Sequence, residues 1–377
     1  MALRIAVLKE RAAGEQRVAI TPETVKKFAG LGAQLAVESG AGTSASISDA
    51  DYTEAGASVG TAADTVKGAD IVLGVQAPDV DLLAGANPGA WVAATFDPFA
   101  AKDRVEAYAK AGFEALSMEF MPRITRAQSM DVLSSQSNLS GYKAVIAAAD
   151  QYGRAFPMMM TAAGTVQAAR VFIMGVGVAG LQAIATAKRL GAQVSATDVR
   201  SATKEQIQSL GAKPIFVESV EGIEGEGSGG YATEMSEEYQ KAQAELVSSH
   251  IAKQDIVITT ALIPGRAAPR LISDEQIKSM KPGSVIYDLA VAQGGNVEGS
   301  KPDELVERHG VTIMGYSNTP ASLAPDTSAL FARNLFNFLS AFWDKEAGKP
   351  VLDEEIGDAV RLTQGGAIVN ERLKENG

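Results

Sequence analysis

Three glycines with the spacing G-x-G-x-x-G follow an apolar run, 171–174, near the middle of the chain. Gly175 would permit a tight strand-to-helix turn, Gly177 would let the backbone approach a pyrophosphate, and Gly180 would let the helix pack closely on the strand. The free N–H groups and the positive dipole end of that helix favour a bound phosphate. The sequence therefore predicts a dinucleotide-binding turn made of Gly175, Val176, Gly177, Val178, Ala179 and Gly180.

A second apolar run ends on Asp198, an acid at the distance from the glycines that the dinucleotide motif requires. Its carboxylate could accept hydrogen bonds from ribose hydroxyls, which favours NAD over NADP. Arg200 could meet a 2′-phosphate or be a solvated residue at the start of a helix, but Asp198 would repel a phosphate. The alternative is a glycine turn with a packing role alone, but that would not explain an acid at the end of the second strand. We therefore expect NAD(H), with Asp198, Val199 and Arg200 on its adenosine side.

A polar loop follows an apolar strand at 121–138, just before the second series of strands. Loops at the carboxyl ends of strands line ligand crevices in open α/β sheets, so this loop could offer Arg and Asp to a carboxamide and a ribose. The structural alternative is an Arg–Asp pair that stiffens the loop, with Ser137 or Asn138 capping the next helix. Both interpretations stay open for Arg123, Arg126, Gln128, Asp131, Ser134, Ser137 and Asn138.

The composition excludes several classes of function. The 34 basic and 45 acidic residues give a net charge of −11, which argues against nucleic acid or an anionic membrane surface as a direct partner. The absence of cysteine excludes disulfides and thiolate chemistry. His250 and His309 are not spaced as metal ligands, so we expect two solvated side chains and no metal site. Without a signal peptide or an apolar span, we expect a cytoplasmic protein with no direct membrane insertion.

Apolar runs alternate with helical patterns in two successive series, which predicts an α/β fold. We expect two Rossmann-like, doubly wound parallel-sheet domains joined by long helices at 137–156 and 328–345. A cleft between the domains would hold cofactor and substrate. The expected domains are 1–136 plus 326–377, to which the C-terminal segment returns, and 137–325.

The segment 218–239 is rich in glycine and acids and has no usable period. It is a tolerated insertion between a strand and a helix, or a lid over the nucleotide with Tyr231 as the contact residue. Sequence physics alone does not choose between them.

At these motifs the chain resembles domain I, the NAD(H)-binding component or alpha subunit, of the proton-translocating nicotinamide nucleotide transhydrogenases. The matching segments are MPRITRAQSMDVLSSQSN, FPMMMTAAGT, GVGVAGLQAIATAKRLGA, ATDVR and TTALIPG. The opening LKERAAGEQRVAITPE resembles the start that these proteins share with alanine dehydrogenases, in one superfamily. The similarity covers nearly the whole chain.

The resemblance implies a homodimeric, Si/Re-specific transhydrogenase component that presents NADH to NADP(H) held by a separate component. Residues matching Arg123, Asp131 and Ser134 would position the dihydronicotinamide, and the residue matching Gln128 would reach toward the NADP(H). The residue matching Tyr231 would belong to a loop that closes on the nucleotide. Proton translocation would occur in a membrane component, which would hold this chain at the cytoplasmic face of the inner membrane. The TTALIPG segment adds Thr260, Ala261 and Leu262 to the expected cofactor-binding residues.

The main alternative is an alanine dehydrogenase-like enzyme, which would need an acid–base residue near the reacting carbon. Such relatives carry a lysine in a KVKEP-like segment and a histidine after the next strand. The corresponding segments here are GVQAP, with Gln76, and VAATFDP, without histidine. A hydride passing between two nicotinamides needs no such group, so the sequence favours the transhydrogenase. A non-catalytic NAD-binding module is a third hypothesis, which the polar loop disfavours.

Overall fold

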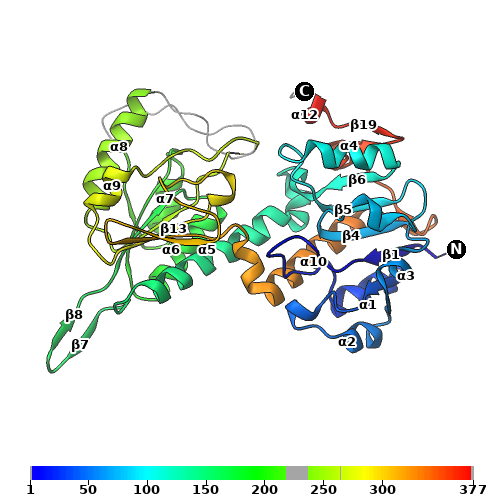
Figure 1. Cartoon of the computed structure of the whole chain (residues 1–377), viewed down its shortest axis with the longest axis horizontal. Coiled ribbons are helices and arrows are strands. Elements are labelled where there is room, and N and C mark those ends of the chain that lie inside the picture. The colour runs from blue at the N-terminus through cyan, green and yellow to red at the C-terminus, as the bar shows by residue number, and fades with distance from the viewer. Residues whose placement is uncertain (1, 218–236, 264, 375–377) are drawn as a thin grey trace. The chain divides into compact units, whose positions relative to one another are not determined.

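The computed structural model describes residues 2–217, 237–263 and 265–374. The chain forms two compact units (Figure 1). The first contains Met1–Gln136 and Ala321–Gly377, and the second contains Ser137–Pro320. The long helix α5 (Val132–Gln151) runs across the boundary from the first unit into the second. The fold is α/β with two parallel-stranded Rossmann-like sheets, as the alternation of apolar runs predicts.

The first unit has a six-stranded, fully parallel sheet in the order β3-β2-β1-β4-β5-β6. This is the strand order of a doubly wound dinucleotide-binding fold. In such a fold successive strands are added toward one edge up to the third strand and toward the other edge from the fourth. The strands are β1 (Arg4–Val7), β2 (Gln34–Glu38), β3 (Ser58–Gly60), β4 (Ile71–Gln76), β5 (Trp91–Thr95) and β6 (Glu114–Ser117). The helices are α1 (Pro22–Gly30), α2 (Asp49–Glu54), α3 (Ala62–Val66), α4 (Lys102–Ala111), α10 (Ala324–Ala341), α11 (Glu354–Val360) and α12 (Glu371–Lys374).

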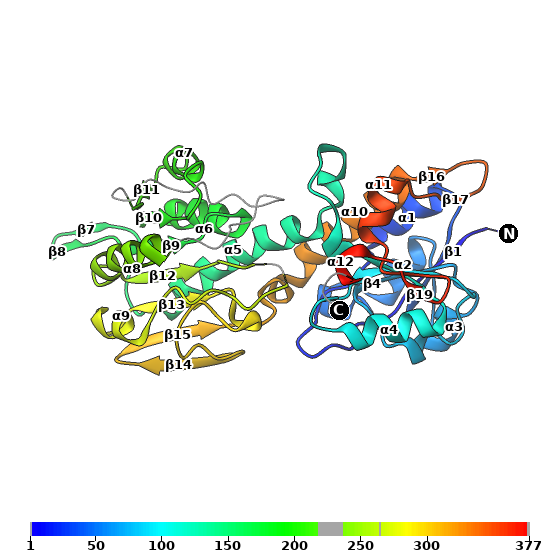
Figure 2. The ribbon, with the colours of Figure 1, turned by 90° about the horizontal axis from the view of Figure 1, so that it is seen from above.

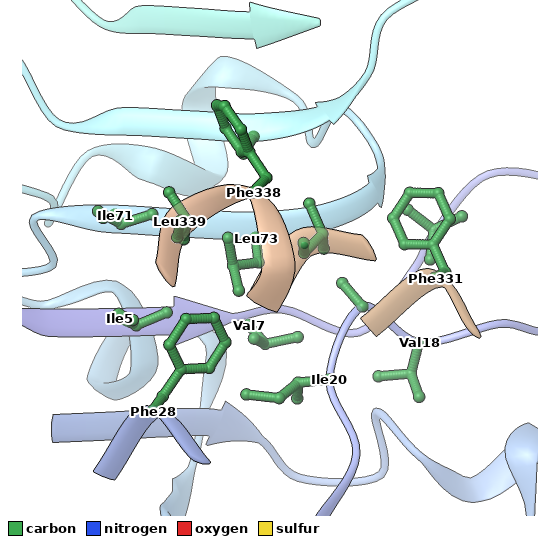
Figure 3. Packing of buried hydrophobic residues seen from close by; sticks show 14 of the residues in the cluster. Ile5, Val7, Val18, Ile20, Phe28, Ile71, Leu73, Phe331, Phe338 and Leu339 are labelled. Carbon is green, nitrogen blue, oxygen red and sulfur yellow. The ribbon is translucent and has the colours of Figure 1, made fainter. Parts of the chain in front are cut away.

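The core of the first unit is built from both ends of the chain (Figure 3). Phe338 and Leu339 of α10 lie among Ile5 of β1, Leu73 of β4 and Phe28 of α1, and all five side chains are buried. Helix α10 begins four residues before the expected 328 because a proline in its first turn already has the helical φ angle. The C-terminal segment therefore supplies part of the first hydrophobic core.

The second unit has a seven-stranded sheet in the order β11-β10-β9-β12-β13-β15-β14, in which only the edge strand β14 is antiparallel. The strands are β9 (Arg170–Met174), β10 (Gln193–Thr197), β11 (Lys213–Pro214), β12 (Ile256–Thr259), β13 (Val285–Asp288), β14 (Glu304–Arg308) and β15 (Val311–Gly315). Its further helices are α6 (Val178–Arg189), α7 (Thr203–Ser209), α8 (Glu237–Ile251) and α9 (Asp274–Ser279). The first four strands again follow the dinucleotide-binding order.

A β-hairpin of β7 (Met159–Thr161) and β8 (Gly164–Val166) extends away from the sheet of the second unit (Figures 1 and 2). Its first strand and the preceding residue expose three methionines in a row, with Met158, Met159 and Met160 at 59%, 43% and 79% of their full accessibility. Small antiparallel pairs also join β16 (Trp343–Asp344) to β17 (Lys349–Pro350) and β18 (Thr363–Gln364) to β19 (Ala367–Ile368). Among the described residues, every helix is too short or too polar to cross a bilayer.

Candidate functional site

The glycine motif forms the tight turn between β9 and α6. Gly175 has a φ of 98°, in the left-handed region that favours glycine. A Cβ on Gly180 would lie 1.9 Å from the carbonyl oxygen of Gly175, so only glycine allows the helix to approach the turn this closely. At Gly177, the N-cap of α6, no side chain caps the helix. The first N–H groups of the helix therefore have no side-chain cap, an arrangement that suits a bound anion.

Asp198, just beyond the end of β10, links the second strand of the sheet to the glycine turn. Its side chain is buried, and one carboxylate oxygen accepts a hydrogen bond from the Val176 N–H at 2.7 Å. The other oxygen accepts from the backbone N–H and the Nε of Arg200, both at 2.9 Å. The guanidinium of Arg200 thus lies against Asp198, and the partly buried Val199 lies between them in sequence. A 2′-phosphate would have to compete with this ion pair for Arg200, which fits NAD better than NADP.

The segment after β12 packs directly on the glycine turn. Thr260 donates its hydroxyl to the Gly175 carbonyl and its N–H to the Met174 carbonyl, both at 2.9 Å. Ala261 follows with both backbone polar groups hydrogen-bonded, and Leu262 keeps 36% of its surface exposed. The structure therefore brings Thr260, Ala261 and Leu262 beside the turn. The predicted lid residue Tyr231 lies outside the described residues.

Gly141 of α5 is a residue of this site that the sequence analysis did not single out. A Cβ at Gly141 would lie 2.0 Å from the carbonyl oxygen of Ala179, in the first turn of α6. The two helices therefore touch backbone to backbone just where α6 presents its N-terminus. The available signal was an isolated glycine inside a helical pattern, which often marks close packing.

Residues 121–136 of the polar loop belong to the first unit, and helix α5 begins within the loop, earlier than expected. The Asp131 carboxylate accepts hydrogen bonds from the Ser134 N–H at 2.9 Å and the Ser134 hydroxyl at 2.6 Å. Asp131 therefore caps α5, and the expectation that Ser137 or Asn138 would do so is wrong, because both lie inside the helix. The structure thus brings Asp131 and Ser134 together, while Arg123 and Gln128 are exposed on the same loop.

Arg126 does not form the stiffening pair with an aspartate of its own loop. Its guanidinium instead binds Asp353 at 2.6 Å and Glu355 at 2.5 Å, at the start of α11. These hydrogen bonds raise the pKa of Arg126. Arg126 therefore joins the loop to the C-terminal segment. The resemblance gives this arginine no role at the cofactor.

The two histidines differ from each other. His250 is partly buried rather than solvated: its Nε2 lies 2.8 Å from the Ser195 hydroxyl, and its ring packs edge-on against Phe172. Burial lowers its pKa. His309 is partly exposed and lies 3.0 Å from Asp274. In the part of the chain that the structure describes, no group of three or more His, Cys, Asp or Glu side chains could hold a metal ion.

Family comparisons agree with this architecture. The Alanine dehydrogenase/PNT C-terminal domain matches residues 144–371, and the N-terminal domain of the same name matches residues 6–140. The chain belongs to the alanine dehydrogenase/PNT family. The two matched regions correspond closely to the two series of strands in the sequence.

Several members of this family resemble the chain over nearly its whole length. The first part of NAD(P) transhydrogenase subunit alpha from Rhodospirillum rubrum is 53% identical over 100% of both chains. Its counterpart from Rickettsia prowazekii is 45% identical over 99% of this chain and 98% of its own. A solved transhydrogenase from Sinorhizobium meliloti has a TM-score of 0.86 at 50% identity, covering 98% of this chain and 99% of that one. A solved L-alanine dehydrogenase, at 24% identity and a TM-score of 0.80 over 99% and 98% of the two chains, shares the fold.

At the carboxyl ends of β1, β4 and β5, this family member carries a partly buried polar network. The Gln76 amide donates to Glu15 at 3.2 Å and accepts from the Thr95 hydroxyl at 3.1 Å. Glu15 pairs with the buried Arg17 at 2.7 Å. The side-chain amide of Gln76 cannot gain or lose a proton as lysine can. Gln76 therefore contributes hydrogen bonds to this network but no acid–base group.

Two glutamates of this network have opposite pKa shifts. Glu10 accepts hydrogen bonds from the N–H groups of Val75 at 2.6 Å and Gln76 at 3.2 Å. Burial nevertheless raises the pKa of Glu10 to about 7, with the neighbouring charge of Glu15 adding to the effect. Burial alone would also raise the pKa of Glu15, but its hydrogen bonds and ion pair with Arg17 lower it to about 2.

The glycine turn gives a prediction that separates packing from ligand contact. Gly180→Ala should lower the melting temperature and weaken NADH binding by roughly tenfold or more, because its Cβ would collide with the Gly175 carbonyl. Gly177→Ala should keep the melting temperature, since nothing described lies within 4 Å of its Cβ, and should weaken binding by obstructing the pyrophosphate. Thermal denaturation and NADH fluorescence titration measure both. Gly30→Ala, also in open space, is the control; a Gly180 variant as stable as the unmodified chain contradicts the argument.

Glu10 gives a prediction about pH. Its pKa is raised from 4.5 to about 7, so the folded protein binds this proton more tightly than the unfolded chain. Its stabilising contribution is complete below the unfolded pKa and is lost as the pH rises through about 7. Glu10→Gln should therefore reduce the fall in melting temperature between roughly pH 5 and pH 8.

The matched control for this experiment is Glu23→Gln. Hydrogen bonds from Arg333 and Lys27 lower the pKa of the exposed Glu23 to about 2, so it stays ionised over the tested range. Its replacement should leave the pH dependence unchanged. Equal slopes for the Glu10 variant and the unmodified chain would show that Glu10 does not titrate there.

Proposed function

We propose that this chain is the NAD(H)-binding component of a proton-translocating, Si/Re-specific nicotinamide nucleotide transhydrogenase. It presents NADH so that a hydride passes directly to NADP⁺ held by a separate component. The observation that carries this proposal is the 53% identity to the first part of a transhydrogenase alpha subunit over 100% of both chains. The glycine turn and the polar loop support it with groups suited to the two halves of the cofactor.

Each half of NADH has its own binding groups in this proposal. The N–H groups at the start of α6 hold the pyrophosphate, and Asp198 exchanges part of its bonding with Arg200 for the ribose hydroxyls. Arg123, Asp131 and Ser134 position the dihydronicotinamide, with the last two already hydrogen-bonded to each other. Gln128, exposed on the same loop, reaches toward the NADP(H) of the partner.

The proposed reaction requires the protein to orient the two nicotinamide rings, not to transfer a proton. A hydride that leaves one nicotinamide and enters another releases no proton, so no general acid or base takes part. The rings must approach to near-attack distance, about 3–3.5 Å. The amide of Gln76, in the partly buried network of the first unit, is consistent with this requirement and argues against an amino acid dehydrogenase.

Two further components complete the proposed assembly. One binds NADP(H), and the other is a membrane component that translocates protons. These partners hold the chain at the cytoplasmic face of the inner membrane, without insertion of its own segments. The net charge of −11 fits attachment through protein partners better than attachment to anionic lipid.

Hydride transfer by the unmodified chain tests this function. NADH oxidation should occur only with the NADP⁺-loaded partner component, because the chain supplies only one of the two nucleotide sites. Gln128→Ala should keep NADH affinity and slow transfer, while Asp198→Ala should weaken NADH binding through the lost ribose contacts. Stopped-flow absorbance and NADH titration separate the two effects.

Pyruvate with ammonia, in place of the partner, is the control acceptor for this experiment. NADH oxidation with pyruvate and ammonia alone would overturn the proposal in favour of an alanine dehydrogenase. If NADH is oxidised with neither acceptor, the remaining hypothesis is a non-catalytic NAD-binding module. Normal transfer by the Gln128 variant would contradict the role of that residue.

The proposed assembly contains a homodimer of this chain, for which the β7–β8 hairpin supplies an apolar surface. Exposed methionines in a row mark an interaction surface, because water contact with so much apolar area is unfavourable. Light scattering should give twice the 39.2 kDa of one chain, and Met160→Asp should shift the dimer toward the monomer. Val351→Asp, at a 54% exposed site of the first unit, is the control. A mass of one chain at micromolar concentration contradicts the dimer.

A further inference from the structure

Asn296 is fully buried and uses every hydrogen-bonding group of its side chain. Its Oδ1 accepts from the Ala261 N–H at 3.1 Å, and its Nδ2 donates to the Ala261 carbonyl at 2.9 Å. The second Nδ2 hydrogen goes to the Pro269 carbonyl at 2.8 Å. One side-chain amide thus pairs with both polar groups of a single residue, as a neighbouring strand would.

This pairing begins where the sheet hydrogen bonds of β12 end. The strand ends at Thr259, and Thr260 is bonded to the glycine turn through the Gly175 carbonyl. Ala261 is therefore the first residue after β12 whose direction depends on a side chain from elsewhere. Without Asn296, the N–H and carbonyl of this partly buried residue would lose these partners, which is unfavourable inside a protein.

Asn296 is itself held firmly. Its N–H donates to the fully buried Asp288 at 3.3 Å, and its carbonyl accepts from Leu271 at 2.8 Å and Ile272 at 3.0 Å. Gly294 and Gly295 precede it with φ angles of 95° and 78°, which deliver the side chain into the interior. The Asp288 carboxylate also accepts from the Ala290 N–H at 2.9 Å and from the Thr259 hydroxyl at 3.3 Å, so hydrogen bonds link the ends of β12 and β13.

We infer that Asn296 is a positioning residue that fixes segment 260–262 against the nicotinamide half of the bound dinucleotide. In a doubly wound sheet the two halves of a dinucleotide lie on opposite sides of the first strand. Asp198, after β10, is on the adenosine side, so the segment after β12 adjoins the other half. The inference rests on the proposed NADH binding and adds a residue that does not itself touch the cofactor.

The test compares NADH with 5′-AMP as ligands of the full chain. Asn296→Asp keeps the shape but replaces the Nδ2 donor by an oxygen that faces two carbonyls. The Kd for NADH should rise by roughly tenfold, while the Kd for 5′-AMP changes by less than about twofold. A general loss of structure would weaken both ligands equally, so the ratio of the two Kd values reports positioning.

Asn370→Asp is the matched control. Asn370 is a buried asparagine of the first unit whose Nδ2 also donates to backbone carbonyls, those of Ala359 at 3.1 Å and Arg361 at 3.0 Å. The same substitution there should leave both Kd values unchanged. If Asn296→Asp does not fold, Asn296→Ser retains one hydroxyl and should show the same selective loss for NADH.

The outcomes are distinguishable. Unchanged NADH affinity in folded Asn296 variants, or equal weakening of NADH and 5′-AMP, would overturn the positioning role while the unmodified chain still binds NADH. Absence of NADH binding by the unmodified chain would overturn the proposed function, and this inference with it.

Discussion

The carbonyl group of Gly175 lies where the glycine turn, helix α6 and the segment after β12 meet. A Cβ on Gly180 would lie 1.9 Å from this oxygen, and the Thr260 hydroxyl donates to it at 2.9 Å. Helix α6 can approach this oxygen so closely only because Gly180 has no side chain. Val176, the residue after Gly175, donates its N–H to Asp198, so the glycine turn contacts α6, Asp198 and the segment after β12.

The backbone N–H groups at the carboxyl ends of the parallel strands have different partners in the two units. In the first unit, Glu10 accepts hydrogen bonds from the last two N–H groups of β4, and Glu119 accepts those of Phe96 and Asp97 after β5, at 2.8 and 2.7 Å. These internal carboxylates occupy positions where a ligand anion could bind in an open sheet. In the second unit, no side chain caps the start of α6. Carboxylates of Asp198 and Asp288 lie at strand ends of the second unit too, so the uncapped start of α6 is what distinguishes that edge.

Most of the fold could be predicted from the sequence because buried parallel strands are continuous apolar runs. Strands β3, β11 and β14 of the two sheets do not stand out as apolar runs, since the first two have three and two residues and the third is a polar edge strand. The start of α5 was misplaced because Asp131 was considered as a ligand contact rather than as a cap. Asn296 could not be predicted, because its partner Ala261 is 35 residues away and a Gly-Gly-Asn stretch indicates only a turn.

Helix α10 completes the first hydrophobic core with residues that follow the whole second unit in the sequence. During synthesis, the strands of the first unit leave the ribosome long before Phe331 and Phe338 are available to cover them. The second unit is continuous in sequence and can complete its own core first. The nascent chain therefore carries an unfinished first domain while the nucleotide-binding domain folds, and an arrest before α10 would leave the apolar face of β1 and β4 exposed to chaperones and proteases.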